Sequence, residues 1–398
     1  MSEKEQDPQD AQELKELHKF WSEQPVVKAD ENRDEFECYI DMKIPVTAPP
    51  AKPVTLPAGF TWCDLDPTNP VHLNEIYKFL SLNYVEDSEH RFRFLLSEQL
   101  LSWALTVPNF IKDWIFGVRT KTGALAGFIS GVPMDIRLNG KVEPWCSVNF
   151  MCVHSHLRKR KMAPVLIFEL HRRVRLHNVY RAVFSGADIP SKPFAKAIYK
   201  HRPLNLKKLS QIGFYPIAQN RMAAAQKRFM IPKLVHGNVR PFRPEEDTDS
   251  LLQLLQETGE KFKFDVEFTP ETIQHFFTPR NDILYTYVIP GATGITAMFS
   301  FYIMNWSVLN DNRVSEVRAA YIWYTATNIV DMNSLIADLL YKAVNDAKAD
   351  IANSLTIMGL KDALTANKFE SGNKELEYYS YNFAVPNIED SELRFLFI

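Results

Sequence analysis

The chain has 398 residues, 46% of them hydrophobic, so it is long enough for two domains and can bury a substantial core. Its net charge of −2 argues against a dedicated nucleic-acid binder, and any strongly basic site must therefore be local. The four cysteines form no C-x-x-C pair, and neither a signal peptide nor an apolar run of about 18 residues is present, so we expect a soluble cytoplasmic protein without a transmembrane segment.

Taken in chain order, the first half predicts an alternation of helices and strands. Residues 1–16 are polar and acidic and predict a mobile N-terminus, and the proline-rich stretch 45–57 predicts an extended loop. The elements expected next are helices over 73–80 and 97–105, strands over 114–120 and 125–132, a turn at Asn139-Gly140, a strand over 148–153, a helix over 163–178 and a strand over 181–184.

The second half predicts the same order of elements. These are helices over 247–257 and 270–277, strands over 283–289, 295–303 and 317–324, a helix over 331–348 and a strand over 355–358. The two halves share no obvious sequence identity, yet the repeated order indicates a structural duplication. We place its boundary near residues 237–244, which divides the chain into an N-terminal half over 17–236 and a C-terminal half over 237–398.

A basic run lies where a predicted strand meets a predicted helix, in "VNFMCVHSHLRKRKMAPVL" from Val148. Four cations, Arg158-Lys159-Arg160-Lys161, precede the helix, whose N-terminal N–H groups and partial positive charge favour phosphate. Coenzyme A carries a pyrophosphate and a 3′-phosphate and suits such a junction. A solvated basic loop or a nuclear-localisation patch is the alternative interpretation. The corresponding junction in the second half, from Thr325, contains no cation.

Several motifs together resemble the eukaryotic N-myristoyltransferase family. They are "HKFWSEQPV" from His18, "NYVED" from Asn83, "NFMCVHSHLRKRKMAPVLI" from Asn149 and "AAYIWY" from Ala319. The resemblance covers nearly the whole chain from about residue 17. It implies an α/β (α+β) fold of two tandem acetyltransferase-like (GNAT-type) halves that share a saddle-shaped mixed sheet surrounded by helices. It also implies transfer of myristate from myristoyl-CoA, a substrate and not a permanently bound cofactor, to the N-terminal glycine amine of a protein.

The resemblance implies catalytic roles for four residues. The backbone amides of Phe150 and Met151 would form the oxyanion hole, Ser185 would lie near the incoming amine, and the terminal carboxylate of Ile398 would act as general base. The apolar ending "SELRFLFI" indicates independently that the chain end lies inside the protein, although a terminal strand buried only for packing would give the same pattern.

The donor-binding residues implied by the resemblance fall in two segments. They are Lys19, Phe20, Trp21, Phe150, Met151, Cys152, Val153, Arg158, Lys159, Lys161, Met162 and Ala163. The family commonly has serine where Lys159 stands and arginine where Lys161 stands, so the individual phosphate contacts are expected to differ.

Recognition of the substrate peptide is expected from both halves. The acidic cluster Glu86, Asp87 and Glu89 suits a lysine of the peptide. The resemblance adds Tyr199, His201, Ser300 and Tyr321. The segment "KFESGNKELEYY" from Lys368 departs from the glycine-rich segment that is usual in the family, because Glu370, Asn373 and Lys374 replace glycine, aspartate and glycine.

Other functions remain as alternatives at this point. The chain could be a short-chain acyl-CoA N-acyltransferase, or a catalytically weak protein that binds acyl-CoA or peptide; a nucleic-acid binder that uses the basic run is less favoured, since no aromatic residues lie among the cations. His154-x-His156 lacks a third metal ligand, so no metal is expected. Cys152 lacks a readable His/Asp set, so direct transfer is preferred over an acyl-enzyme. We expect a monomer.

Overall fold

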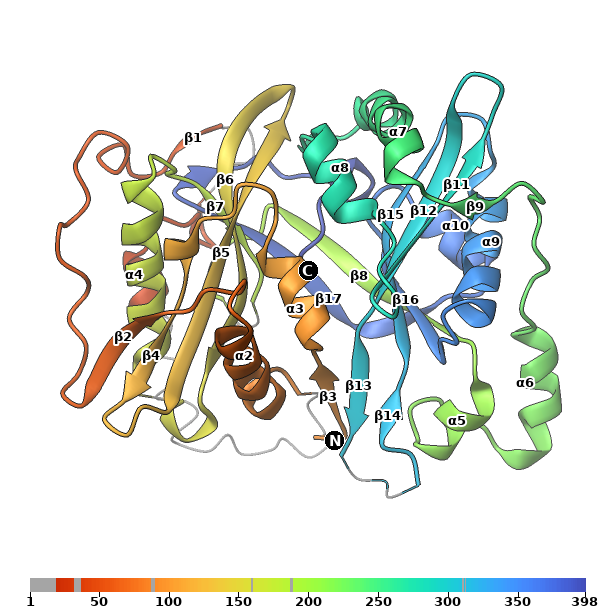
Figure 1. Cartoon of the computed structure of the whole chain (residues 1–398), viewed down its shortest axis with the longest axis horizontal. Coiled ribbons are helices and arrows are strands. Elements are labelled where there is room, and N and C mark those ends of the chain that lie inside the picture. The colour runs from red at the N-terminus through yellow and green to blue at the C-terminus, as the bar shows by residue number, and fades with distance from the viewer. Residues whose placement is uncertain are drawn as a thin grey trace.

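The structure is a computed structural model in which residues 19–31, 37–86, 90–158, 160–186, 189–309, 311 and 313–398 are described. The N-terminal segment 1–16 lies outside these residues. One long mixed sheet runs through the molecule with helices packed around it (Figure 1). This arrangement confirms the predicted α/β fold class.

The first half supplies a group of antiparallel strands and a crossover helix. Its elements are β2 (Phe60–Asp64), α2 (Pro70–Asn83), β3 (Phe92–Leu95), α3 (Glu98–Leu105), β4 (Ile115–Thr120), β5 (Leu125–Leu138), β6 (Lys141–Val153), α4 (Met162–Leu176) and β7 (Ala182–Phe184). The turn between β5 and β6 is at Asn139-Gly140, where both residues have the positive φ that a type I′ turn requires. Helix α4 connects β6 to the parallel strand β7.

The second half repeats this connection. Its elements are β9 (Arg240–Pro241), α7 (Pro244–Gly259), β10 (Phe264–Val266), α8 (Pro270–Phe277), β11 (Leu284–Pro290), β12 (Ile295–Ile303), β13 (Asn305–Val308), β14 (Glu316–Val317), β15 (Ala319–Thr327), α9 (Met332–Asn345), β16 (Ile351–Leu355) and α10 (Lys361–Ala366). Strands β11, β12 and β15 are antiparallel, and α9 connects β15 to the parallel strand β16, as α4 connects β6 to β7. The predicted repetition of elements is therefore present in the topology.

The two halves exchange strands at the centre of the sheet. The order there is β6-β7-β17-β8-β16-β15, in which β8 (Ala195–Pro203) and β17 (Glu370–Tyr381) pair with each other. Strand β17 comes from the end of the chain but pairs with β7 of the first half, and β8 comes from the first half but pairs with β16 of the second. Figure 1 shows the blue β17 and the green β8 crossing the middle of the molecule.

Short elements complete the fold. They are β1 (Cys38–Tyr39), α5 (Leu206–Gln211), α6 (Met222–Arg228), β18 (Phe383–Ala384) and β19 (Leu393–Arg394). Strand β1, near the start of the described chain, pairs with β18 close to its end. Strand β19, five residues or fewer from the C-terminus, pairs in parallel with β10.

One sequence-based expectation about strands was wrong, and two central strands were missed. The strand predicted over 355–358 lies instead at Ile351–Leu355, and the chain turns away after it, with positive φ at Met358 and Gly359. The polar pair Asn353-Ser354 obscured this strand in the sequence, although both side chains are buried. Strands β8 and β17 were not predicted, because their alternating charged residues resemble a solvated segment.

Candidate active site

Strand β6 leaves its neighbour β7 at the point where the resemblance places the reaction. The two parallel strands are paired at Cys146 with Ala182 and at Ser147 with Val183. Beyond these pairs β6 continues to Val153, whereas β7 ends at Phe184. The backbone of β6 after Ser147 is therefore not paired with β7.

A bulge distorts β6 at Phe150 and Met151. The register with β5 changes from Phe128 opposite Cys152 to Ser130 opposite Asn149, so two residues of β6 face one of β5. Phe150 has a φ of 52°, which is a strained conformation for a bulky side chain. The Ser130 hydroxyl donates to the Asn149 carbonyl at 2.8 Å and holds the strand beside the bulge. At such a bulge the regular ladder of hydrogen bonds between β5 and β6 is interrupted, so the main-chain N–H groups of Phe150 and Met151 can bind another acceptor.

The basic run follows directly and leads into α4. Lys161 is the N-cap of α4, with a φ of 59° and no side-chain hydrogen bond to the helix end, and the first turn contains no acidic residue. The exposed side chains of Arg160 and Lys161 add positive charge to this end. Positive charge at a helix N-terminus favours anions, so phosphate binding here stays a prediction. Lys159 lies outside the described residues.

Arg158 makes hydrogen bonds to main-chain carbonyls on two elements. Its guanidinium donates to the carbonyl of Val153 at 3.3 Å and to the carbonyl of Asn83 at the end of α2. The Asn83 side chain in turn accepts from the Ser155 N–H at 3.1 Å. These contacts fasten the end of β6 to α2, so Arg158 supports the loop as well as adding charge to it.

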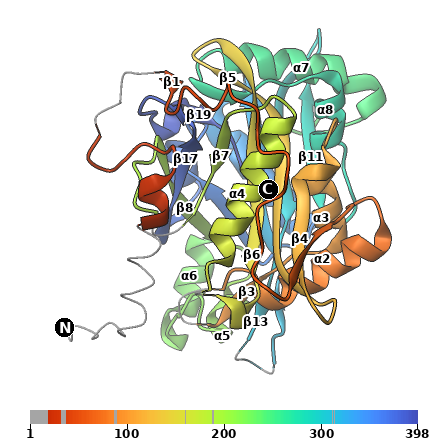
Figure 2. The same cartoon turned by 90° about the vertical axis from the view of Figure 1, so that its left-hand side faces the viewer.

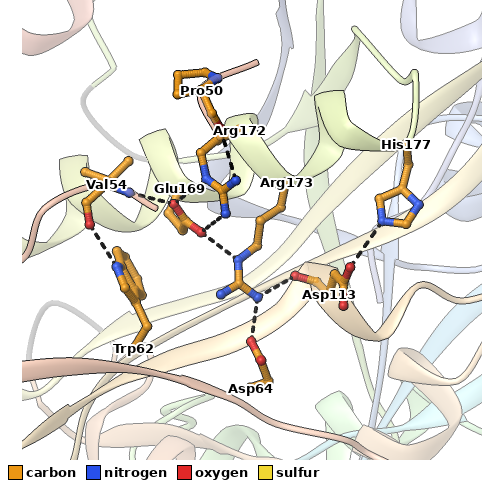
Figure 3. A network of polar contacts seen from close by, with 9 residues as sticks. All are labelled: Pro50, Val54, Trp62, Asp64, Asp113, Glu169, Arg172, Arg173 and His177. Atoms are coloured by element: carbon orange, nitrogen blue, oxygen red, sulfur yellow. Dashed lines mark hydrogen bonds and ion pairs between the residues drawn. The ribbon is translucent and has the colours of Figure 1, made fainter. Parts of the chain in front are cut away.

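A buried ion-pair network fixes α4 against the rest of the first half (Figure 3). The buried Glu169 carboxylate accepts from Arg172 at 2.7 Å, from Arg173 at 2.8 Å and from the Val54 N–H at 2.9 Å. Burial raises the pKa of Glu169, but the hydrogen bonds from Arg172, Val54 and Arg173 outweigh it and hold the pKa below its ordinary value. Arg173 extends to Asp64 of β2 at 2.6 Å. The network joins the loop over 45–57 and β2 to the helix whose N-terminus would bind the donor.

The N-terminal donor-binding segment packs beside α4. Trp21 stacks on Phe184 of β7 with ring centroids 5.3 Å apart, and Phe20 contacts the half-exposed Phe168 of α4 at 5.4 Å. Lys28 donates to the carbonyls of Trp21 and Gln24 and so closes the helical turn over residues 19–23. The structure thus brings the segment at 19–21 to the same side of the sheet as the basic run.

The C-terminal end lies at the middle of the molecule in both views (Figures 1 and 2). Phe395 is buried, and Leu396, Phe397 and Ile398 are half-buried and pack against the core. The Tyr378 hydroxyl donates to the Phe395 carbonyl at 3.0 Å. The apolar ending therefore packs inward, as its composition predicts.

Tyrosine side chains that are partly or fully buried lie near the bulge and near the C-terminal end. Tyr84 lies with its ring 6.0 Å from that of Phe150, and burial raises its pKa, with further contributions from the nearby Cys152 and Tyr199. Burial raises the pKa of Tyr199 to about 12, and Tyr199 lies close enough to raise the pKa of Tyr378 further. These phenols stay neutral near pH 7, so they can offer hydroxyl groups without adding charge.

Family profiles, named relatives and a solved structure match nearly the whole chain. The family profile described as Myristoyl-CoA:protein N-myristoyltransferase, N-terminal domain, matches residues 39–197, and its C-terminal domain matches 211–394. The chain belongs to the N-myristoyltransferase family. The glycylpeptide N-tetradecanoyltransferase of Plasmodium falciparum is 34% identical over 381 residues, covering 94% of this chain and 92% of the relative. That of Dictyostelium discoideum is 35% identical over 381 residues, with coverages of 94% and 91%.

A solved structure of an N-myristoyltransferase shows the same fold. The crystal structure of the Saccharomyces cerevisiae N-myristoyltransferase with bound myristoyl-CoA superposes with a TM-score of 0.87 at 31% identity, covering 94% of each chain. Among the described residues of this family member, no helix is long and apolar enough to traverse a bilayer, and no three His, Cys, Asp or Glu side chains group as metal ligands would.

The peptide-binding residues implied by the resemblance lie on three strands of the sheet, β8, β12 and β15. Tyr199 and His201 lie on β8, and Tyr321 on β15, where Tyr321 stacks on Tyr302 at 5.4 Å. His201 Nδ1 donates to Asn353 Oδ1 at 2.7 Å, and burial lowers the pKa of His201, so its Nε2 remains an acceptor. Ser300 is fully buried and hydrogen-bonded to Thr286 at 2.9 Å, which leaves it inside the sheet.

The acidic cluster is represented by one described member. Glu86 accepts from the Arg93 guanidinium and contacts His90 Nδ1 at 2.7 Å, and the hydrogen bonds from these two residues lower its pKa. The predicted contact between Glu86 and a peptide lysine would therefore compete with an existing ion pair. Asp87 and Glu89 lie outside the described residues.

The altered segment at 368–374 forms the start of β17. Glu370 pairs with Arg228 of α6 at 2.7 Å and accepts a hydrogen bond from the Tyr215 hydroxyl. Gly372 is packed so closely that a Cβ there would lie 2.6 Å from His201 Nε2. The replacement of a family glycine by Glu370 thus adds an anchor to α6, while a glycine is kept where β17 passes His201.

Several residues of the site were not predicted from the sequence. Asn83, Tyr84, Tyr378 and Asn353 connect the predicted residues to one another, as described above. "NYVED" contains the first two, but only its acidic residues were interpreted. No local signal in the sequence marks Tyr378 or Asn353, since both acquire their partners through strands distant in the chain.

Proposed function

We propose that the chain transfers myristate from myristoyl-CoA to the N-terminal glycine amine of proteins, as the names of its relatives state for those proteins. The observation that carries the proposal is the bulge at Phe150 and Met151, together with a C-terminus that packs inward and is bound by Tyr378. Thioester aminolysis requires an oxyanion site and a base that accepts the proton of the amine.

Donor binding would use the first half, which we propose to delimit at residues 17–236. The phosphates would lie at the N-terminus of α4 beside Lys161, with Arg158 and Lys159 adding charge. The remaining contacts proposed are Lys19, Phe20, Trp21, Phe150, Met151, Cys152, Val153, Met162 and Ala163. The acyl chain needs an apolar enclosure, and burying twelve methylenes would contribute roughly 10 kcal/mol at about 0.8 kcal/mol each.

The chemical step would be a direct attack. The glycine nitrogen bonds to the thioester carbon, the oxygen carries negative charge in the tetrahedral intermediate, and the Phe150 and Met151 amides stabilise it. The C–S bond then breaks and coenzyme A leaves as its thiolate. The Ile398 carboxylate takes the proton lost by the amine, which can pass on to the thiolate, and Ser185 would orient the amine.

An acyl-enzyme through Cys152 is disfavoured by its surroundings. Burial raises the pKa of Cys152 to about 12, in spite of the nearby Arg158, so its thiol is protonated near neutral pH. The thiol also lies 3.3 Å from the Asn83 carbonyl, to which it donates. A protonated, hydrogen-bonded thiol is a poor nucleophile, which supports direct transfer.

Peptide recognition would use the second half, residues 237–398, together with the edge of the first. We propose that Tyr199, His201 and Tyr321 line the path, with Ser300 supporting it from within the sheet. Glu86, Asp87 and Glu89 would attract a lysine of the peptide. We further propose that the enzyme is a cytoplasmic monomer.

A transfer assay tests the function directly. With myristoyl-CoA, a Gly-start peptide should be labelled and the matched Ala-start peptide should not; equal labelling would refute the N-terminal glycine specificity. A series of acyl-CoA lengths should peak near fourteen carbons, whereas a preference for acetyl-CoA would indicate a short-chain N-acyltransferase. Binding of myristoyl-CoA without any transfer would indicate a catalytically weak member of the family.

A further inference from the structure

We propose that Arg394, through its ion pair with Asp265, is a positioning residue that sets the depth of the C-terminal carboxylate in the active site. The inference rests on the proposed role of Ile398 as general base. Arg394 is the last charged residue of the chain and is followed only by Phe395, Leu396, Phe397 and Ile398. The mechanism described above makes no use of it.

The ion pair is buried and bidentate. Arg394 has 1% of its surface exposed and Asp265 has 0%. Arg394 Nε donates to Asp265 Oδ1 at 2.7 Å, and its Nη2 donates to Asp265 Oδ2 at 2.7 Å and to the Leu255 carbonyl at 2.8 Å. Two parallel hydrogen bonds between planar groups fix an orientation as well as a distance.

Both partners are held on short parallel strands. Asp265 of β10 and Arg394 of β19 are direct neighbours in the ladder, so the side-chain pair strengthens a backbone pairing of two residues. Arg137 of β5 also binds Asp265, which fixes the carboxylate to a long central strand. Gly259 leaves room for this cluster, because a Cβ there would lie 2.4 Å from Arg394 Nη2.

Arg394 lies only four residues before Ile398, so fixing Arg394 also restricts the position of the terminal carboxylate. Four residues span at most about 13–14 Å, so the point at which the chain is fixed at Arg394 limits where its end can lie. The Tyr378 hydroxyl bound to the Phe395 carbonyl provides the next point of attachment. A slip of the β19–β10 register would move every later residue, and with it the carboxylate.

Stability alone does not account for a buried pair at this place. Apolar residues of similar volume often replace a buried ion pair with no loss of stability, whereas a charged pair specifies one register. Aromatic rings flank the pair, with Phe262 5.0 Å and Phe268 5.8 Å from the Arg394 guanidinium. The two parallel hydrogen bonds between Arg394 and Asp265 favour one register of β19 on β10. A fixed register is useful here because the carboxylate of Ile398 must be placed accurately.

The test compares Arg394→Lys in two backgrounds: the natural chain, and a chain extended by Gly-Ser after Ile398, which displaces the carboxylate. We expect Arg394→Lys to lower kcat for a Gly-start peptide by about tenfold to a hundredfold in the natural chain. The Kd for myristoyl-CoA should stay within about twofold. In the extended chain, where the base is already displaced, the same substitution should cause no further loss of kcat.

A matched control separates positioning from general stability. Arg240→Lys removes the same kind of bidentate pair, with Asp247 on α7, at the far edge of the sheet. It should lower the melting temperature without changing kcat. If Arg394→Lys does not fold, Arg394→Met combined with Asp265→Leu removes both charges together and should give the same loss of kcat.

The outcomes are distinct. An unchanged kcat in Arg394→Lys, or equal losses in the natural and extended chains, would overturn the positioning role while leaving the proposed function intact. Full transfer activity of the extended chain without any substitution would overturn the assignment of Ile398 as the base, and the positioning role with it. Loss of kcat confined to the natural chain would support the inference.

Discussion

The ring of Tyr378 stacks on the ring of Phe397 with centroids 5.4 Å apart. Tyr378 belongs to β17, the strand that pairs with both β7 and β8, so the stack attaches the chain end to the centre of the sheet. The same tyrosine binds the carbonyl of Phe395. Its ring and its hydroxyl thus hold two of the last four residues, which limits the freedom of the terminal carboxylate.

Adding two polar residues after Ile398 should abolish most of the acyl transfer. The extension moves the carboxylate away from the amine, and losing a general base costs about 10²- to 10⁴-fold in rate. Single-turnover transfer to a Gly-start peptide measures the step, and titration with myristoyl-CoA should show nearly unchanged binding. The same two residues added at the N-terminus serve as control. Parallel losses of transfer and of donor binding would indicate a general structural defect instead.

Replacing Cys152 with alanine should leave transfer within about threefold of the natural rate, because a direct attack has no covalent thiol intermediate. The high pKa of this thiol, about 12, also predicts slow alkylation at pH 7. A steady-state assay measures the transfer rate, and a thiol-labelling time course measures the alkylation rate. A loss of more than a hundredfold, together with a trapped acyl-thioester on the natural protein, would contradict direct transfer.

Neutralising Lys161 as Lys161→Gln should raise the Kd for myristoyl-CoA by about tenfold, the value of one charge-assisted hydrogen bond to phosphate. The salt dependence of binding should become shallower, since one cation fewer meets the phosphates. Lys361→Gln, at an exposed position of α10 in the second half, is the matched control and should not change the Kd. Equal effects of both variants would place the phosphates elsewhere.

Acid should weaken the fold through His275. Burial lowers the pKa of His275 to about 4, and its ring is hydrogen-bonded to the Trp103 carbonyl at 2.8 Å. Between pH 6.5 and 4 the unfolded chain binds a proton that the folded chain does not, so stability falls as the pH drops through this window, by at most about 3 kcal/mol.

Urea unfolding at pH 7 and pH 4.5 measures this effect. In His275→Gln the loss of unfolding free energy between the two values should be smaller by about 2 kcal/mol than in the natural chain. His156→Gln, at an exposed position, should keep the natural difference. An unchanged difference in His275→Gln would show that this histidine does not carry the acid sensitivity.

Elements with local signals were predictable from the sequence. Helix α8 lies at Pro270–Phe277 as expected, because Thr269 caps it, Pro270 starts it and its apolar residues lie on one face. The hairpin turn at Asn139-Gly140 is equally local. For such elements a few neighbouring residues contain the information that determines the structure.

The remainder of the fold depends on partners distant in the chain. Strand β8 is recognisable only beside β16 and β17, which follow it by about 150 residues or more. Nearby pairs can be hidden as well: the pairing of Glu86 with Arg93 and the hydrogen bond of Ser300 with Thr286 join residues 7 and 14 positions apart, yet no motif marks either pair. For the site, the family resemblance indicated Phe150 and Met151, but the bulge there requires the register of β5, which no motif contains.

The exchange of β8 and β17 has a consequence for how the protein is made. When residue 203 has left the ribosome, β8 still lacks both of its neighbours, and the open edges of β7 and β8 must wait for more than a hundred further residues. The pairing of β17 with β7 and β8 can form only near the end of synthesis, when residues 370–381 have been made. Neither half can therefore be expected to fold as an independent fragment, and a nascent chain that stalls midway presents three unsatisfied strand edges to chaperones, one on β7 and two on β8.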